Sequence, residues 1–449
     1  MGAKASTVEA DVEEKEPFTD DPEIAESDGF ARSRSCRVSM LSESLRVQSD
    51  LSHSIHQLAE MGNTEVIQLK VKNQENVDLL NSDQLAPLHY ATRYNQVSTV
   101  QLLLENGADV NVKGLDDLTP LHFAARMKPR QTKAKPESPA LQDNQVGGET
   151  HAATSPSATP TTPSELPEES MVRLLAKHGA LLDTQDKYGQ TPLHFAAMTG
   201  NLAAAKDLIK CGAVVEIEDN QQMTPIIVAA TYGYADIVRL LLVQAKANIR
   251  HADSSKQNAL HRAAKGGHLE IVKMMIQTAK TMKNFQSFLD ARDAKKKTSL
   301  YHAASNGHAE VVALLLAEGV DVDADNVTLA TPLHAAASVG NVLVISMLLE
   351  YNAQLDATDL YQRTPLMYAA GGDHTDAIAT LVSRGASMDA RDLNRSTPLL
   401  IAAQSGHAAA VQALLDLGAN ERAMDKLDKT ALYLSAEHGK LEVLQSANS

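Results

Sequence analysis

The chain has 449 residues, a formal net charge of −15 and 43% hydrophobic residues, yet only 4% aromatic residues and no Trp. This acidic balance argues against a nucleic-acid partner, because nothing supplies a broad basic face for phosphates. The two cysteines, Cys36 and Cys211, lie in different regions, which argues against a disulfide framework and fits a reducing compartment. No run approaches the length of a membrane span, and the first residues lack the apolar core of a signal peptide, so we expect a cytoplasmic protein.

Residues 1–50 are expected to form a disordered tail, because they are acidic and show no apolar period. Met1–Ser6 fits the pattern for myristoylation of Gly2, the alternative being a chance match in a flexible tail. One myristoyl chain binds membranes only marginally, so location at the inner face of the plasma membrane needs a second signal. Arg32–Ser39 offers a weak basic anchor, an acylated Cys36 or a kinase site, or it is simply a solvated segment.

A seven-residue motif organises the rest of the chain. It reads TPLHFAA at Thr119–Ala125 and at Thr191–Ala197, and TPLHAAA at Thr331–Ala337. Looser copies begin at Ala86, Thr224, Asn258, Thr298, Thr364, Thr397 and Thr430. From Thr298 to Thr430 each step is 33 residues, and a fixed period of this kind indicates a stacked repeat.

One unit can be followed from Thr191 onward. The hydroxyl of Thr191 is expected to cap a helix, and Pro192 suits the first helical position, where the missing N–H is not needed. Gly200 ends this helix, a second helix is predicted from about Leu202 to Lys210, and Asp219 begins a turn before the next motif. Two short helices bury their apolar faces only when they stack on copies of themselves.

This pattern resembles the ankyrin repeat, whose marker is the TPLH sequence. The resemblance implies an all-α repeat solenoid of about eleven units, each with paired antiparallel helices and a β-turn finger. Repeats are expected at 51–126 and 171–445. The first, at 51–83, lacks the motif and is predicted to be a cap, and the last is incomplete. An array that stops within a unit would be a truncated product, a fragment, or a chain that lacks a further domain.

Two insertions interrupt the period. The step from Thr119 to Thr191 is 72 residues, and the extra 39 fall inside one repeat, between its two helices. Residues 127–170 hold seven of the sixteen prolines and are predicted to form a disordered loop, either a set of phosphorylation sites or a passive spacer. The step from Asn258 to Thr298 has seven extra residues, which should lengthen the second helix or the loop after it.

The motif histidines are interpreted as structural. His89, His122, His194, His261 and His334 recur once per unit, so they form a ladder and do not converge on a metal. In the family that the chain resembles, this histidine bonds between loops and helices of adjacent units. The structural set comprises Thr119, Pro120, His122, Thr191, Pro192, His194, Thr331, Pro332 and His334. We expect no metal, no cofactor and no catalysis, because no nucleotide, hydrolase or zinc motif is present.

The predicted function is a non-enzymatic scaffold that binds other proteins through finger tips and the groove along the first helices. The candidate partner-binding residues are Lys187, Tyr188, Met198, Tyr232, Lys295, Lys297, Tyr361 and Arg363. Tyr and Arg are frequent at the centres of interfaces. Lys295–Lys297 with Arg292 forms a basic finger that either receives an acidic peptide or is only solvated.

Two other functions stay open. The length of the array, with stretches such as Ala86–Asn111 and Asn258–Ile276, resembles the cytosolic ankyrin region of transient receptor potential channels of the A subfamily. That resemblance implies the arm of a cation channel, here as a fragment or a non-conducting form, because the six membrane helices and the pore are absent from this sequence. The other alternative is an adaptor for a ubiquitin ligase or a kinase.

Overall fold

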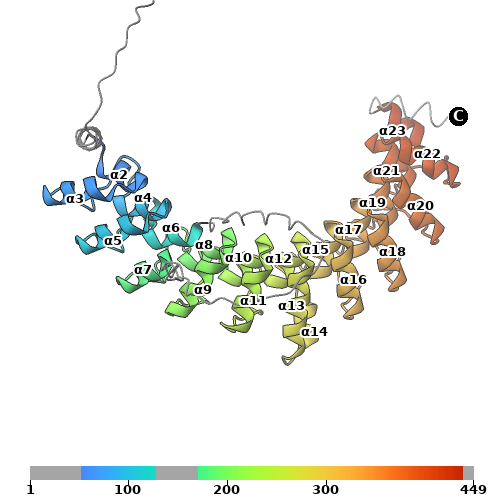
Figure 1. Ribbon diagram of the computed structural model, residues 1–449. Helices are drawn as coiled ribbons and strands as arrows, with labels where there is room; N and C mark the ends of the chain where they lie inside the picture. Colours follow the sequence, from blue (N-terminus) through green and yellow to red (C-terminus); the bar gives the residue numbers. More distant parts are fainter. Residues whose placement is uncertain (1–51, 128–169, 438–449) are drawn as a thin grey trace, which may run out of the picture. The chain divides into compact units, whose positions relative to one another are not determined.

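The computed structural model describes residues 52–127 and 170–437. Nearly all of them belong to one compact unit, Ile55–Ser449, in which short helices stack in two rows (Figure 1). The predicted tail at 1–50, Gly2 and most of the insert at 127–170 lie outside the described residues. No helix in the described ranges has both the length and the apolar character needed to cross a bilayer.

Eleven helices of the described residues form the first row, one from each repeat. They are α2 (Ile55–Met61), α4 (Pro87–Arg93), α6 (Pro120–Arg126), α8 (Pro192–Thr199), α10 (Pro225–Tyr232), α12 (Ala259–Gly266), α15 (Ser299–Ser305), α17 (Pro332–Ser338), α19 (Pro365–Gly371), α21 (Pro398–Ser405) and α23 (Ala431–Glu437). Each contacts the next along the row. The small pair that ends the motif, such as Ala196 and Ala197, is fully buried and lets neighbouring helices approach closely.

The second row packs against the first, helix by helix. Its helices are α3 (Thr64–Lys72), α5 (Val97–Glu105), α7 (Met171–Lys177), α9 (Leu202–Cys211), α11 (Ala235–Val243), α13 (Leu269–Lys280), α16 (Ala309–Ala317), α18 (Val342–Glu350), α20 (Thr375–Ser383) and α22 (Ala408–Asp416). The seven extra residues lengthen α13 and also add a short helix, α14 (Phe285–Leu289), whose Phe288 is buried. The two-row, all-helical stack is the predicted all-α repeat solenoid.

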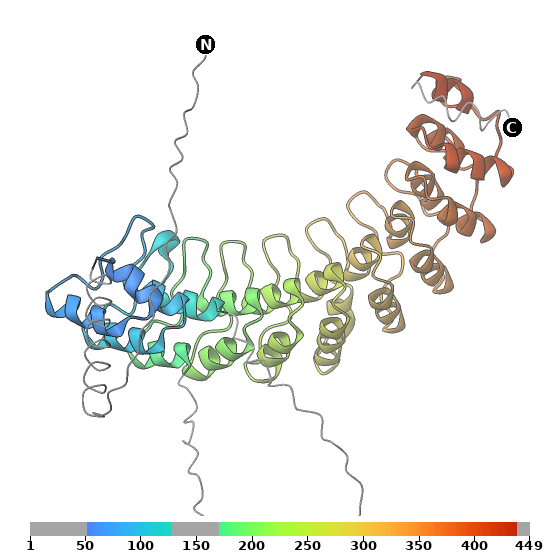
Figure 2. The same cartoon turned by 45° about the horizontal axis from the view of Figure 1, so that its top comes forward.

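Hairpin fingers connect one repeat to the next and stand side by side (Figure 2). From Lys187 onward, each finger donates a backbone hydrogen bond to the finger before it, as from Asn220 N to Tyr188 O at 2.9 Å and from Leu393 N to Tyr361 O at 3.1 Å. The finger before α6 also contains a short 3₁₀ turn, η1 (Leu115–Asp117). This backbone ladder fixes the relative positions of side chains on neighbouring fingers.

The motif threonine stands at the N-cap position of its helix and contacts the motif histidine. The hydroxyl of Thr191 lies 2.9 Å from Nδ1 of His194, and the two residues form a capping box at the start of α8. In two repeats where the motif histidine is missing, the threonine does cap: Thr298 accepts a hydrogen bond from Tyr301 N and Thr397 accepts one from Leu400 N. In two other repeats without the histidine, the hydroxyls of Thr224 and Thr364 form no hydrogen bond among the described residues, so the absence of the histidine does not by itself make the threonine a cap.

Candidate partner-binding site

The motif histidines join each helix to the finger that follows it. The N–H of Thr191 donates to Nδ1 of His194 at 3.1 Å, so this nitrogen carries no proton. Nε2 of His194 therefore carries the proton and donates it to the carbonyl of Met223, 2.9 Å away in the next finger. His122 and His334 make the same pair of contacts, with the carbonyls of Gln190 and Arg363. These histidines are structural connectors.

Burial keeps these rings neutral. It lowers the pKa of His194 and of His334 below the ordinary value, although the hydrogen bonds to carbonyls act in the opposite direction. Burial likewise lowers the pKa of His89 to about 4. For His261 the pKa is also lowered to about 4, by burial and then by the neighbouring His302. A neutral ring is the form that can accept at Nδ1 and donate at Nε2 at the same time.

An Asp or Asn at the base of most fingers accepts backbone hydrogen bonds, a role that the sequence analysis noted only as a turn at Asp219. Oδ1 of Asp359 accepts hydrogen bonds from the N–H groups of Tyr361, at 2.8 Å, and Arg363, at 2.7 Å. The same acceptor role recurs at Asp186, Asp219, Asp253, Asp293, Asn326, Asp392 and Asp425. These residues lie five positions before the motif in every unit from Thr191 to Thr430, and this spacing is the signal that would have identified them.

The residue that directly follows the motif histidine position often forms a hydrogen bond or an ion pair with Oδ2, the second oxygen of this carboxylate. The hydroxyl of Tyr368 donates to Oδ2 of Asp359 at 2.8 Å, and burial, followed by that carboxylate, raises the pKa of Tyr368. Arg262 pairs with Asp253, and Nε2 of His302 lies 2.9 Å from Oδ2 of Asp293. The finger bases are thus rigid, and partner contacts fall to the side chains beyond them.

Three of the predicted partner-binding residues line one groove. Tyr188 comes from a finger, Met198 from α8 and Tyr232 from α10, and together they border a groove of about 480 Å³. Phe195 and Tyr234 complete its aromatic wall. Tyr188 and Tyr232 are 52% and 54% exposed, so much of each side chain is accessible to a partner. We call this the aromatic groove.

Lys187 lies beside the aromatic groove, but its ammonium group already forms an ion pair within the fold. Its ammonium forms an ion pair with Asp116 of the preceding finger, and it also lies 4.9 Å from the ring centroid of Tyr188. The carboxylate and then the tyrosine raise the pKa of Lys187. Lys187 therefore orients Tyr188, and its ammonium already has a partner.

Tyr361 and Arg363 lie elsewhere, on a finger beside a second groove. Arg363, Met367 and Tyr368 line this groove of about 330 Å³ together with Ile401 of α21. The guanidinium of Arg363 lies 6.0 Å from the ring centroid of Tyr361, and its Nε is 3.6 Å from Oδ2 of Asp392. The ring of Tyr361 is 52% exposed. The predicted residues are therefore divided among separate repeats.

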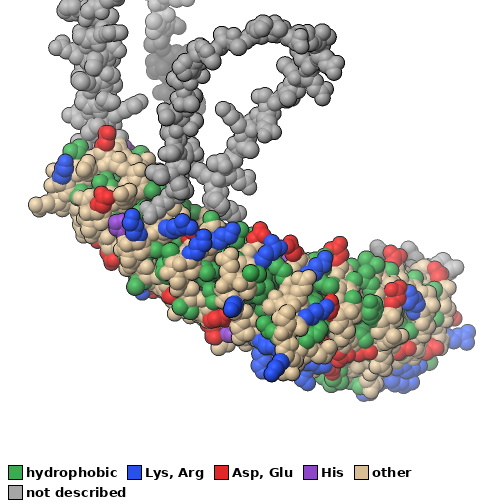
Figure 3. Space-filling model, turned by 60° about the horizontal axis from the view of Figure 1, so that its bottom comes forward, with side chains coloured by type: hydrophobic (Ala, Val, Ile, Leu, Met, Phe, Trp, Pro, Cys, Tyr) green, Lys and Arg blue, Asp and Glu red, His purple; other side chains and the backbone are tan. Residues whose placement is uncertain are grey.

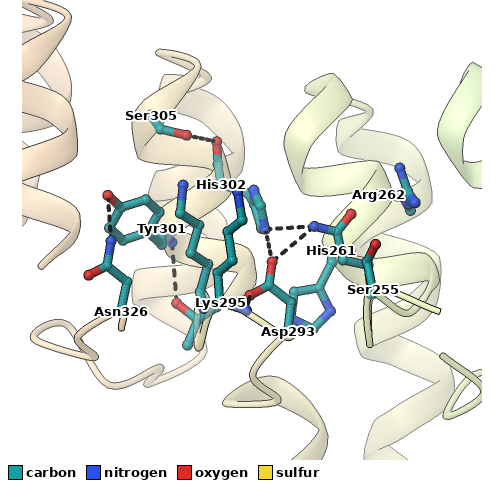
Figure 4. A network of polar contacts seen from close by, with 12 residues as sticks. Ser255, His261, Arg262, Asp293, Lys295, Tyr301, His302, Ser305 and Asn326 are labelled. Atoms are coloured by element: carbon teal, nitrogen blue, oxygen red, sulfur yellow. Dashed lines mark hydrogen bonds and ion pairs between the residues drawn. The ribbon is translucent and has the colours of Figure 1, made fainter. Parts of the chain in front are cut away.

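Lys295 and Lys297 lie on a third finger, above a polar network that Figure 4 shows in detail. Asp293 accepts the N–H groups of both lysines at 2.8 Å and also bonds to His302. Lys295 is exposed, whereas Lys297 is half-buried with its ammonium 4.6 Å from the ring centroid of Tyr301. Of the two predicted residues, Lys295 is the more available for a partner.

Within residues 52–127 and 170–437, no group of His, Cys, Asp and Glu side chains is arranged to hold a metal ion. The predicted lipidation site, Gly2, and the phosphorylation sites of the insert lie outside these ranges. The described surface therefore offers grooves and charged fingers as its binding features.

Comparison with protein families settles the fold family. The model for ankyrin repeats matches residues 55–133, 165–253, 242–326, 322–392 and 384–446. The chain belongs to the ankyrin-repeat family. Ankyrin repeats generally bind other proteins and generally have no catalytic role. This identity agrees with the finger ladder and the paired helices described above.

Curated relatives match this ankyrin array over short stretches. Inversin from dog is 34% identical over 93 residues, which is 21% of this chain and 8% of that protein. The human SH3 and multiple ankyrin repeat domains protein 2 is 31% identical over 114 residues, 25% of this chain and 6% of the relative. The mouse serine/threonine-protein kinase TNNI3K is 31% identical over 98 residues, 21% of this chain and 12% of the kinase. The chain thus matches only a small part of each relative, so their whole activities do not transfer to it.

Proposed function

We propose that this chain is a non-enzymatic scaffold or adaptor and that the aromatic groove is its main partner-binding site. The carrying observation is the convergence of Tyr188, Met198 and Tyr232 on one groove from two consecutive repeats. Aromatic side chains bury large apolar area at low cost in conformational entropy, and they dominate the centres of interfaces. The family supports the protein-binding part of this proposal.

The geometry favours a protein partner. Tyr188 and Tyr232 present apolar rings with hydroxyls at their tips, while Asp116 and Arg126 add charged groups at the border of the groove. An apolar centre with a polar border is the usual composition of a protein interface. The groove is held by the finger ladder and by an edge-on contact between His122 and Phe195, whose ring centroids are 5.3 Å apart. A partner would meet a surface that needs little ordering.

The test is an affinity capture with the full chain, followed by mass spectrometry and by binding measurements on the main captured protein. The double variant Tyr188→Ala and Tyr232→Ala should weaken that binding at least about tenfold, as expected for interface centres. The matched control is Leu343→Ala with Tyr351→Ala, two exposed residues of the α18 region in the second row. Equal binding by a folded groove variant would place the site elsewhere.

The groove at Tyr361 and Arg363 is a second candidate. A variant in which Tyr361 and Arg363 are replaced by Ala, while Tyr188 and Tyr232 are kept, distinguishes this second groove from the aromatic groove. If all four replacements together leave binding unchanged while the helical content is preserved, the interaction would have to involve the tail, the insert or another surface.

Three further proposals concern the whole protein. A cytoplasmic location, with attachment to the inner face of the plasma membrane through Gly2, is tested by labelling cells with a myristate analogue and comparing Gly2→Ala. The alternative, an arm of a transient receptor potential channel of the A subfamily, is tested by sequencing the transcript downstream of the codon for Ser449. Six hydrophobic spans there would support the channel. Co-purification of a ubiquitin ligase or a kinase would support the enzyme-adaptor alternative.

A further inference from the structure

Five lysines gather on two consecutive fingers and the helix between them. They are Lys256 on one finger, Lys265 near the end of α12, and Lys295, Lys296 and Lys297 on the next finger. We call this set the basic patch. All but Lys297 are exposed. Such a concentration of positive charge is unexpected on a chain with a net charge of −15.

None of these five ammonium groups forms an ion pair with a carboxylate among the described residues. The acids at the bases of these two fingers, Asp253 and Asp293, are 3% and 5% exposed, and their oxygens accept bonds from finger N–H groups and from Arg262 or His302. Because these two carboxylates are buried and hydrogen-bonded within the fold, the exposed lysines dominate the electrostatic potential that an approaching ligand meets.

The second-row face of the unit is different. Figure 3, which views the unit from the side of α9, α11 and α13, shows cationic and anionic side chains close together. There Arg239 pairs with Glu270, and Lys280 lies 2.7 Å from Glu318. The second row also carries exposed lysines that form no ion pair among the described residues, such as Lys206, Lys210 and Lys273, so the basic patch is distinguished by its five lysines on two consecutive fingers and the helix between them.

The two fingers of the basic patch are held in place before any ligand arrives. Ala294 N donates to Ser255 O at 2.8 Å, and the amide of Gln257 donates to Oδ2 of Asp293 at 2.9 Å. Burial lowers the pKa of Lys297, the charge of Asp293 acts in the opposite direction, and the charges of Lys295 and Lys265 lower it again, so these three cations lie close enough to repel one another. An anionic ligand would relieve that repulsion.

The kind of free cation indicates the kind of anion. The two arginines nearby are occupied, Arg262 by Asp253 and Arg292 by Asp325 at 2.8 Å. The free groups are lysines, which act as separate point charges and lack the planar fork that grips one phosphate through two bonds. Charges distributed over two fingers suit a run of carboxylates along an extended chain.

We propose that the basic patch binds an Asp- and Glu-rich segment of a partner protein. This inference rests on the proposed scaffold function and names the partner chemistry of a second surface on the same array. The basic patch lies on the fingers at 253–257 and 293–297, whereas the aromatic groove lies at α8 and α10. One partner can therefore use either surface or both.

The probe is a fluorescein-labelled dodecapeptide in which Glu alternates with Gly, titrated with the full chain and followed by fluorescence anisotropy. We expect saturable binding that weakens as NaCl rises from about 50 to about 200 mM, because added salt screens exposed charges. The same peptide with Gln in place of Glu should not bind. The triple variant Lys256→Glu, Lys265→Glu and Lys295→Glu should weaken binding about tenfold or more.

The matched control places the same three charge reversals on exposed lysines of the second row, as Lys206→Glu, Lys210→Glu and Lys273→Glu. It changes the net charge equally, so it should weaken binding less than about threefold. If the patch variant fails to fold, the Gln triple at the same positions, with an expected loss of about threefold, replaces it. An equal loss in patch and control variants would overturn the proposal.

A third peptide separates carboxylate from phosphate. It carries three phosphoserines in a Gln and Gly background, which gives it about the same charge. Binding of this peptide alone would overturn the proposal in favour of a phosphorylated ligand. Failure of all peptides, with loss of the captured partner in the Tyr188 and Tyr232 variant, would refute the basic patch and leave the scaffold function standing.

Discussion

The backbone N–H of Lys187 donates a 2.9 Å hydrogen bond to the carbonyl of Asp116, although 71 residues separate them. A second contact spans the same insertion, from Leu181 N to Oδ1 of Asn111 at 2.8 Å, over 70 residues. In the next repeat the equivalent bond, from Val214 N to Oδ1 of Asp183, spans 31 residues. The difference of 39 equals the insertion, so the finger ladder continues across it unchanged.

This continuity predicts that the insertion is dispensable for folding. Deleting residues 128–166 and changing Pro167 to Gly restores a 33-residue repeat with glycine at the position that Gly200 occupies in the following unit. Long surface insertions cost little in loop-closure entropy, so we expect the melting temperature to change by no more than about 5 °C. Circular dichroism during heating measures it. A deletion variant that is unfolded at room temperature would refute the prediction.

The periodic motif was sufficient to predict the two rows of helices, because each unit repeats the same local chemistry. Helix two was predicted at Leu202–Lys210 and spans Leu202–Cys211. The extra helix α14 was not foreseen, because a period shows that residues are added and not what shape they take.

The candidate site was less predictable than the fold. Tyr188, Met198 and Tyr232 could be chosen because the repeat places them on variable positions, but their convergence depends on side-chain directions in two neighbouring units. Sequence also could not show that Lys187 pairs with Asp116, a residue far away in the chain. Lys297 was expected at a binding surface, yet it packs on Tyr301. Contacts between repeats decide which charges stay free.

Acid should weaken the array through the histidine ladder. The pKa of His261 is lowered to about 4, from an ordinary value of 6.5, chiefly by burial. The unfolded chain therefore takes up this proton first, so the stabilisation is complete above about pH 6.5 and is lost as the pH falls toward 4. We expect a loss of about 2 kcal/mol from this residue by about pH 5.

The measurement is the urea midpoint of the full chain between about pH 7.5 and pH 5. The variant His261→Gln cannot take up the proton, so it should be less stable at neutral pH but change less on acidification. The matched control is His178→Gln, because His178 is an exposed histidine outside the motif ladder. A variant His261→Gln with the full wild-type pH dependence would contradict this account.

The buried finger acids should be essential for stability, and the chain supplies its own tolerated substitute. Replacing Asp359 by Ala leaves the N–H groups of Tyr361 and Arg363 without their acceptor, which should cost about 2–3 kcal/mol. Asn should be far less damaging, because Asn326 fills the equivalent position and accepts from the N–H groups of Thr328 and Ala330. Urea unfolding of both variants provides the test, and equal losses would show that the charge, and not the acceptor, is what the finger requires.

Two glycines of one repeat should respond differently to the same substitution. Gly200 and Gly212 both have positive φ, at 76° and 101°, so alanine strains the backbone at each by about 1–2 kcal/mol. A methyl group at Gly212 would meet no atom within 4 Å, whereas one at Gly200 would overlap the ring of Tyr234. Because Tyr234 lines the aromatic groove, Gly200→Ala should be the more destabilising change and should also weaken partner binding. Thermal melts and binding of the captured partner measure both effects, and identical behaviour of the two alanine variants would show that Tyr234 moves aside without cost.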